Sequence, residues 1–523
     1  MNSSLTLSVP PPARSRYFTV RFFRWMGRFF FSRRFVWTLV VLASLVVLFY
    51  QYENWNGARE LKAARAHMIA RTGTDDYRTL LPEVVPESEN FFAIPVIQSW
   101  RVPDKTSPGF FIRQFPGDHL LSENYDAPQV VETEGRSVMD LTAWQQKRIK
   151  EGKPLPAGQN AASVICAEIG DGHGIIPQLI AGLDRPKSQI IPCRRACVEE
   201  AGDALRARIP AVTGAFRTQQ VLGLHLRAAA LTGNAAKTRD LAGVMLRLGD
   251  AFNDPIIVGH LVLMALHQVT LDALNEGLGC RNLSDNDFQR IQEWLATINE
   301  VTRVETMFRC ELLQTEPAFE TFRKQVQESR EDTSWIDRIA GNENFGSVMF
   351  SFAMRHGPSG WYDTNRACYI ENALLHCGGT GDEGWRAGVK GAETVAKGAA
   401  ATATLYSNGK FMLPNPRRAL AMCGIPALSN IWHKAAQNLF KRRCAILTCA
   451  LRRYRLAHGA FPASLADLDG PLLPSPQTDP AKAGSPMGYK LTEKGFLLWS
   501  VGDDRNDDGG ETGKDWLWSH EVM

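Results

Sequence analysis

The feature that most constrains this chain is an uncharged apolar run close to its N-terminus, from Phe35 to Tyr52. Its length of about 18 residues is just enough for a helix to cross the hydrocarbon core of a bilayer. Trp37 stands near one end and Trp55 follows the other, at positions where amphipathic rings favour the membrane interface. The sequence therefore predicts a transmembrane helix over residues 35–52.

Positive charge lies on only one side of this run. Residues 1–52 contain no acid and no lysine but seven arginines: Arg14, Arg16, Arg21, Arg24, Arg28, Arg33 and Arg34. Because such an excess marks the cytoplasmic side of a membrane helix, residues 1–34 are predicted to form a basic cytoplasmic tail. The bulk of the chain would then lie outside the cytoplasm, in the periplasm or beyond, anchored by one pass in the inner membrane.

Two other interpretations of the run are open. A cleaved signal peptide would need a small-residue cleavage site, and none follows Tyr50. A buried core helix would leave the seven preceding arginines unexplained. The formal net charge of +4 also comes from this tail, because 59 basic residues less these seven leave 52 against 55 acids. The basicity thus favours membrane lipid as a partner and argues against nucleic acid.

The next two segments differ in proline content and in periodicity. Residues 53–160 are predicted to continue the membrane helix outward as far as Gly73 and then to form a proline-rich, extended or β-containing wrap. Residues 161–428 are predicted to form a helical body of α-hairpins, with amphipathic helices at 216–231 and 235–252. The nearly all-apolar stretch that begins at Ile256 is the candidate for the centre of this bundle.

Residues 429–523 read as a small α+β domain. A helix is expected from Ser429 to Ala457, ended by Gly459, followed by a short helix that Ser464 and Asp467 cap. Residues 488–491 and 495–501 are typical of the two strands of a hairpin. The expected fold is therefore mainly α, with one N-terminal transmembrane helix, an extracytoplasmic helical body and this C-terminal domain.

Four motifs within the C-terminal domain carry a resemblance. Tyr454-Arg-Leu-Ala-His-Gly-Ala-Phe-Pro462, Asp479-Pro480, Gly488-Tyr489 and Ser500-Val-Gly-Asp-Asp504 occur in the order found in the head of the major pseudopilin of type II secretion. The domain resembles that family, which implies a long helix, a small antiparallel sheet and a calcium-bound terminal loop. The whole chain also resembles membrane-anchored bacterial proteins that carry this module. It departs from a pseudopilin because no G-F-T-x-x-E processing site precedes the membrane run, so assembly into a pilus is not implied.

An acidic loop near the C-terminus is the predicted metal site. Asp504, Asn506, Asp508, Gly509 and Asp515 follow the pattern D-x-N-x-D-G-x5-D, the spacing of oxygen ligands in calcium loops. Asp504, Asn506, Asp508 and Asp515 would supply oxygens, and Gly509 would permit the bend. The alternative is a solvated acidic loop.

Other candidate residues are less specific. His260 and His267 share a helix face and are expected to be core histidines rather than ligands. Asp171 and His173 suggest a catalytic loop only superficially. The ten cysteines could form disulfides outside the cytoplasm or pack as small apolar residues, and Cys368, His376 and Cys377 make a poor zinc site. No P-loop, G-x-S-x-G, H-E-x-x-H or dinucleotide motif is present.

These observations favour a structural or interaction protein with envelope or secretion proteins as partners, a calcium-stabilised head and no enzymatic activity. Two alternatives stay open. One is an anchored hydrolase with a divergent site near Asp171 and His173. The other is a peptide-binding helical array with an exposed apolar groove.

Overall fold

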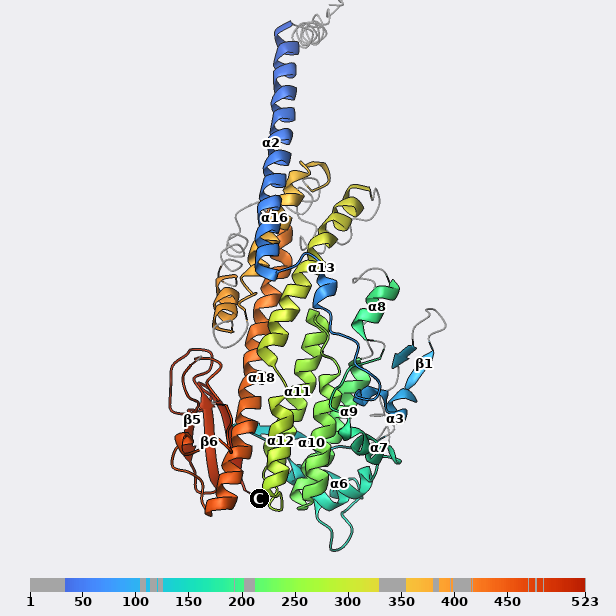
Figure 1. The fold of residues 1–523 in the computed structure, drawn as a ribbon, viewed down its shortest axis with the longest axis vertical. Coiled ribbons are helices and arrows are strands. Elements are labelled where there is room, and N and C mark those ends of the chain that lie inside the picture. The colour runs from blue at the N-terminus through green and yellow to red at the C-terminus, as the bar shows by residue number, and fades with distance from the viewer. Residues whose placement is uncertain are drawn as a thin grey trace, which may run out of the picture.

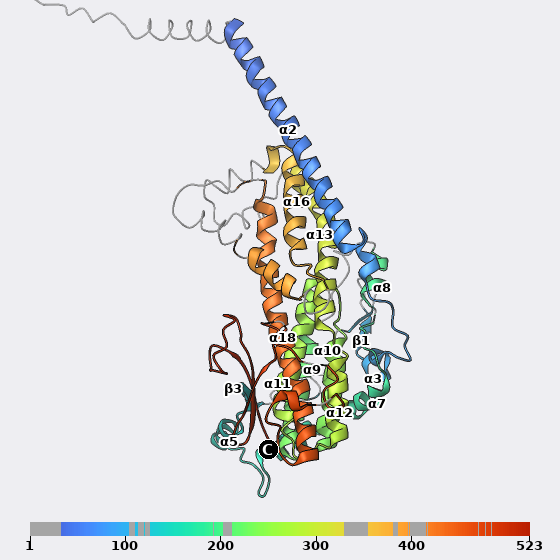
Figure 2. The same cartoon turned by 60° about the vertical axis from the view of Figure 1, so that its left-hand side comes forward.

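The computed structural model describes residues 33–103, 110–112, 120, 126–191, 193–201, 212–328, 354–379, 385–395, 397, 415, 417–468, 470–475, 477–482 and 484–522. Within them the chain is mainly helical, with a small antiparallel sheet near the C-terminus, as predicted. The helices form an elongated bundle from which one helix projects at one end, while the sheet lies at the opposite end (Figures 1 and 2). The predicted tail at 1–34 falls outside these residues except for Arg33 and Arg34.

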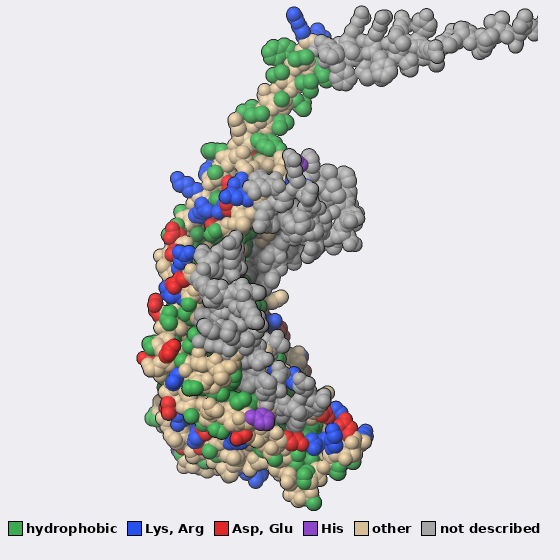
Figure 3. Space-filling view, turned by 90° about the vertical axis from the view of Figure 1, so that its right-hand side faces the viewer, with side chains coloured by type: hydrophobic (Ala, Val, Ile, Leu, Met, Phe, Trp, Pro, Cys, Tyr) green, Lys and Arg blue, Asp and Glu red, His purple; other side chains and the backbone are tan. Residues whose placement is uncertain are grey.

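The projecting helix α2 (Arg33–Thr72) is unbroken from the predicted membrane run into the body. Its side chains are exposed throughout the apolar run, and Figure 3 shows hydrophobic side chains covering this projecting half. Beyond Tyr52 one face becomes buried, at positions three or four residues apart: Glu53, Gly57, Leu61, Ala64, Met68 and Thr72. The helix ends where predicted, at Gly73, whose φ of 77° is left-handed.

Among the residues that the structure describes, two helices have the length and composition to cross a membrane. One is the apolar part of α2, which is not buried at all, and the other is α11 (Ile257–Gly277), which is mostly buried. α11 packs against α9 (Val212–Leu231), α10 (Ala235–Asp250), α13 (Glu300–Glu328) and α18 (Ala419–His458). It is therefore the centre of the bundle, as its apolar sequence predicts, and α2 remains the candidate anchor.

The proline-rich segment contains short elements, as expected, including two small antiparallel hairpins. The strands are β1 (Arg101–Pro103) with β2 (Phe110–Ile112), and β3 (Val130–Thr133) with β4 (Arg136–Met139). Its helical turns are η1 (Tyr77–Leu80), η2 (Phe91–Ala93), α3 (Pro95–Gln98) and α5 (Leu141–Lys150). Phe91, Phe92 and Ile97 are fully buried in the main core, so the segment is part of the folded body.

The body continues with short helices before α9 and longer ones after α11. These are α6 (Ala161–Ile169), α7 (Ile175–Ala181), η3 (Gly182–Asp184), α8 (Arg194–Ala201), α12 (Asp285–Ala296) and α16 (Gly360–Leu374). Ser284 and Asp287 cap α12 reciprocally. Helices that follow one another, such as α9 and α10, lie side by side, which agrees with the α-hairpin prediction.

The C-terminal elements adopt the predicted order with one addition. α18 begins at Ala419, before the predicted Ser429, and ends at Gly459 with a left-handed φ of 81°. The capped turn η4 (Leu465–Asp467) and the hairpin of β5 (Gly488–Leu491) and β6 (Gly495–Ser500) form as expected. A third strand, β7 (Trp516–Glu521), which the sequence analysis left unassigned, pairs antiparallel with β6 and completes the sheet in the order β5-β6-β7.

This sheet packs into the core of the helical body. Phe496, Leu498 and Trp518 belong to the same buried cluster as the centre of the bundle. The Trp518 indole donates to Thr448 Oγ1 of α18 at 3.0 Å. The backbone N–H of Ser519 on β7 donates to the Gly135 carbonyl at the tip of the β3–β4 hairpin, at 3.0 Å. The body and the C-terminal domain therefore share one interior.

Candidate functional site

The junction between α2 and the body is built on two glycines. A Cβ placed on Gly57 would lie 2.2 Å from the Gly360 carbonyl oxygen, and one on Gly360 would lie 2.1 Å from the Glu53 carbonyl oxygen. Contacts this short are sterically forbidden, so only glycine allows α2 and α16 to cross at this distance. The anchor helix is thus packed backbone to backbone against the body.

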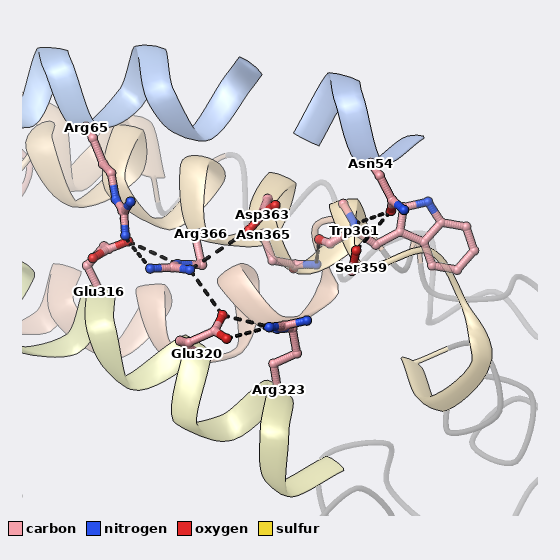
Figure 4. Close-up of polar contacts among 11 residues, drawn as sticks. Asn54, Arg65, Glu316, Glu320, Arg323, Ser359, Trp361, Asp363, Asn365 and Arg366 are labelled. Atoms are coloured by element: carbon pink, nitrogen blue, oxygen red, sulfur yellow. Dashed lines mark hydrogen bonds and ion pairs between the residues drawn. The ribbon is translucent and has the colours of Figure 1, made fainter. Parts of the chain in front are cut away.

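Polar groups close the junction just beyond the apolar run. Glu53 is 3 % exposed, and its carboxylate accepts hydrogen bonds from the Trp361 indole at 3.0 Å and from Arg417. Asn54 Oδ1 accepts from the backbone N–H of Gly360 at 2.8 Å (Figure 4). Glu53, the first acid after the apolar run, is therefore bound inside the body by hydrogen bonds. These bonds fix the position of α2 along its axis and its rotation relative to the body.

A buried ion-pair network joins three helices further along α2. Glu316 of α13 accepts from Arg366 of α16 through Nη2 at 2.6 Å and Nε at 3.0 Å, and from Arg65 of α2 at 3.1 Å. Glu320, one turn on, pairs with Arg366 and with Arg323 (Figure 4). The Arg323 hydrogen bond holds the pKa of Glu320 below its ordinary value. Glu316 and Arg366 are almost completely buried, so removing either charge would deprive the other of its closest partner in the interior.

The body also contacts the apolar run itself. The Tyr50 hydroxyl donates to the His356 carbonyl at 2.5 Å, and the rings of Phe49 and Trp361 meet edge to face at 6.4 Å. Residues 354–361 therefore lie level with the last turn of the predicted span. The sequence analysis missed this junction, although small and apolar residues at helical spacing after Tyr52 are a signal for close helix packing.

The four predicted calcium ligands are not gathered around one point. Asp504 Oδ1 accepts from the backbone N–H of Asn506 at 2.9 Å, and Asp508 lies 3.5 Å from Lys514 Nζ. Within the described ranges, no three His, Cys, Asp or Glu side chains are grouped so as to hold a metal ion. The arrangement of these residues therefore gives the calcium site no support of its own, and the four ligands stay a prediction.

Asp515 is the one predicted ligand with an unused buried oxygen. Its Oδ2 accepts from the backbone N–H groups of Gly510 at 2.8 Å and Glu511 at 3.2 Å, and its Oδ1 is buried with no hydrogen-bond partner. An unpaired buried carboxylate oxygen is costly unless a donor or a cation faces it. This atom is what supports the calcium prediction.

The acidic loop is fastened to the body by groups that the motif does not include. Asp503 pairs with His433 of α18 at 3.1 Å, and Arg505 pairs with Glu393. Asp507 accepts from the Trp499 indole at 2.9 Å, and this bond lowers the pKa of the Asp507 carboxyl. The loop is therefore held against α18 without a metal ion in the arrangement described.

Asp479, which the sequence identified only within the Asp479-Pro480 motif, accepts several hydrogen bonds in the interior of the domain. It is 2 % exposed and accepts from Ser500 Oγ at 2.6 Å, from the Ala481 N–H at 2.8 Å and from the Val501 N–H at 3.0 Å. These bonds tie the turn at Asp479 to the end of β6. The Asp-Pro pair followed by a strand was the available sequence signal.

The remaining candidates fall into core or surface positions. Asp171 and His173 are both exposed on the turn between α6 and α7, so they offer no enclosed catalytic pair. His260 and His267 are buried in the bundle, where His260 Nε2 lies 3.4 Å from Glu300 and His267 Nε2 lies 3.9 Å from Asp250. Burial lowers the pKa of His267 to about 4, as suits a neutral core histidine.

The sulfur-containing candidates are structural in this arrangement. None of the nine cysteines that the structure describes forms a disulfide with another of them, and Cys423 lies outside the residues whose side chains are described. Burial raises the pKa of Cys377 to about 12 and lowers that of His376 to about 4. His376 stacks on Phe308 with ring centroids 4.9 Å apart. Neither residue is prepared for metal binding or nucleophilic chemistry.

Comparisons with protein-family models, with curated proteins and with solved structures found no match to this chain. The functional argument therefore depends on the geometry above.

Proposed function

We propose that this chain is a single-pass membrane-anchored structural or interaction protein that holds its body at a fixed position outside the cytoplasm. The observation that carries the proposal is the continuity of α2. One helix has no buried residue in its apolar run and, beyond Tyr52, buries one face in the body. An anchor attached by a flexible linker would tether the body, whereas this one sets its orientation.

The ion pairs and the glycine crossing support the same conclusion. Glu53, Gly57 and Arg65 all lie on α2 beyond Tyr52, and each contacts a partner in the body. Such packing is needed for a rigid support and would be unnecessary for an enzyme that only has to stay near a membrane. The arginines before the span orient the body outward, toward envelope or secretion proteins as partners.

The C-terminal sheet, with its long helix and acidic loop, is proposed to act as a pseudopilin-like head. Its support is the order of α18, β5 and β6 and the position of the loop beside them. Calcium is proposed to order this loop, on the evidence of Asp515 Oδ1 alone. The head in this proposal is not an independent module, because it shares its interior with the bundle.

A linker insertion tests the proposal. A flexible Gly-Ser segment between Tyr52 and Glu53 keeps the span and the body but breaks the helix that joins them. We expect the variant to stay in the membrane yet fail to replace the native chain in a strain from which the gene has been deleted. The same segment inserted after Gly152, in an exposed turn where a Cβ would meet no atom within 4 Å, is the control. An anchored hydrolase would tolerate both insertions, and that result would reject the structural role.

A second candidate function, peptide binding by the helical array, is favoured by one cavity. It has a volume of about 660 Å³ and lies between α9, α11 and β3, with Val221, Leu224 and Val269 among its apolar walls. Substituting Leu224 with Asp would abolish peptide binding there if this function holds.

A further inference from the structure

An open cavity of about 890 Å³ lies at the end of the body opposite the anchor. It is bounded by the last turn of α18, by the turn between β5 and β6, and by Val522 at the end of β7. Figures 1 and 2 place this end of α18 and the sheet far from the projecting half of α2. The bilayer that holds the anchor therefore cannot fill this cavity.

The cavity is strongly cationic. Arg281, Arg452, Arg455 and Lys494 line it, against a single acid, Glu493. Arg452 is buried and donates to the carbonyl oxygens of Leu278 and Cys280, so it forms the wall.

The other three cations form no ion pair within the part of the chain that the structure describes, where no acid pairs with Arg281, Arg455 or Lys494. The neighbouring Arg453 differs, because it pairs with Asp285 at 2.8 Å. Positive charge therefore exceeds negative charge among the described residues that line the cavity.

A buried histidine beside the cavity responds to this field. His520 of β7 is 1 % exposed, and its pKa lies well below its ordinary value, first because of burial and then because of Arg452, Arg136 and Arg455. The cations that disfavour a proton on His520 would attract a carboxylate placed in the cavity.

The rim adds apolar surface to this charge. Leu456 is 52 % exposed and Leu491 is 46 % exposed, and both line the cavity. The Arg455 guanidinium lies over the Phe461 ring, with Arg455 Cζ 4.9 Å from the ring centroid. This cation–π contact fixes the position of the Arg455 charge. A ligand that carries only charge would leave both leucines in water.

We propose that this cavity docks an acidic segment of a partner polypeptide that carries a large apolar side chain next to its carboxylates. The carboxylates meet Arg281, Arg455 and Lys494, while the apolar side chain covers Leu456 and Leu491. This docking rests on the proposed interaction role and specifies its partner by chemistry.

The test uses the full chain in lipid nanodiscs and fluorescent synthetic peptides that vary separately in their numbers of Glu and Leu residues. We expect fluorescence anisotropy to show saturable binding that strengthens with both. Combining Arg281→Glu with Lys494→Glu should weaken binding at least about tenfold, and Leu456→Ser should weaken binding of only the leucine-containing peptides. Lys490→Glu, an exposed charge reversal on β5 outside the cavity, is the matched control and should leave binding within about twofold.

Three results would overturn the docking proposal. One is that no peptide binds saturably, and another is that Lys490→Glu weakens binding as much as the cavity variants do. The third is that inorganic phosphate displaces the peptides more effectively than chloride does at equal ionic strength. The linker insertion described above does not depend on these peptides. Failure of the peptide test would therefore remove this docking site and leave the anchored structural role standing.

Discussion

Gly57 of α2 and Gly360 of α16 meet so closely that a Cβ on the first would lie 2.2 Å from the carbonyl oxygen of the second. Neither side of this contact is a flexible side chain, so the backbones themselves would have to separate. We expect Gly57→Ala to lower the free energy of unfolding of the body by about 1–3 kcal/mol through overpacking. The measurement is thermal unfolding of the purified chain in detergent. Gly470→Ala, at a glycine with no atom within 4 Å of the added Cβ, is the matched control. Equal melting temperatures for the two variants would contradict the close crossing.

Glu316→Gln should be more damaging, because it removes the carboxylate that accepts the two shortest hydrogen bonds of the buried Arg366 guanidinium and leaves it the more distant Glu320 at 3.4 Å. Breaking one partner of a buried pair costs about 3–5 kcal/mol. Arg65, the other partner of Glu316, is 45 % exposed at its side chain, so Arg65→Leu should cost no more than about 1 kcal/mol. Urea unfolding of the two variants measures the difference. A larger loss for Arg65→Leu would show that the network is not organised around Arg366.

Asp479→Ala should loosen the C-terminal sheet. The substitution deprives the Ser500 hydroxyl and the Val501 N–H of their acceptor, and a buried donor left unpaired costs about 1–3 kcal/mol. Asp504→Ala, which removes one exposed hydrogen bond, is the comparison. Hydrogen exchange of β6 amides should accelerate in the first variant and remain unchanged in the second. Unchanged exchange in both would show that Asp479 does not hold the end of β6.

Stability should fall as the pH drops from neutrality. Burial lowers the pKa of His267 and His376 to about 4 and that of His225 to about 3, from an ordinary value of 6.5. At pH values between the folded and the unfolded pKa of each histidine, the unfolded chain therefore binds more protons than the folded chain. The free energy of unfolding is unaffected by these histidines above pH 6.5. It falls by about 1.4 kcal/mol per pH unit for each histidine as the pH drops toward 4. His376→Leu should flatten the dependence of melting temperature on pH between 7 and 5, whereas His173→Gln, on an exposed turn, should not.

Millimolar calcium should raise the melting temperature of the full chain if the acidic loop binds it. Asp515→Asn replaces the buried carboxylate oxygen of the acidic loop that has no hydrogen-bond partner, so we expect this variant to lose the response. Asp503→Asn, which disturbs only the pair with His433, should keep it. Melting curves that are identical in calcium and in chelator would reject the calcium prediction for the native chain.

Local signals in the sequence were sufficient for many elements. The cap at Ser284, the left-handed Gly459 and the central position of α11 follow from spacing and residue type within a short window. β7 was missed because residues 504–515 were interpreted as a metal loop and no strand was assigned after them, and its pairing with β6 is fixed by tertiary contacts. The crossing of Gly57 with Gly360 is likewise invisible locally, because the two residues lie some three hundred positions apart and neither has a side chain to show a pattern.

The acidic loop illustrates the opposite case. Its residue types and spacing match a calcium motif, but the positions of the side chains depend on neighbours that the motif does not contain. Asp508 pairs with Lys514, Asp503 pairs with His433, and Asp504 accepts a hydrogen bond from the loop backbone. Spacing predicts which oxygens are near one another along the chain, whereas competing partners decide where each one points.

Because α2 enters the body without a hinge, a tilt of its apolar half within a membrane, where we propose that it lies, would be transmitted to the far end of the molecule. A bilayer that becomes thinner would tilt a span of fixed length, and the sheet, at the other end of the long bundle, would swing through the largest arc (Figure 2). The thickness of the bilayer around the apolar half of α2 would then determine how far from the membrane the C-terminal sheet is held.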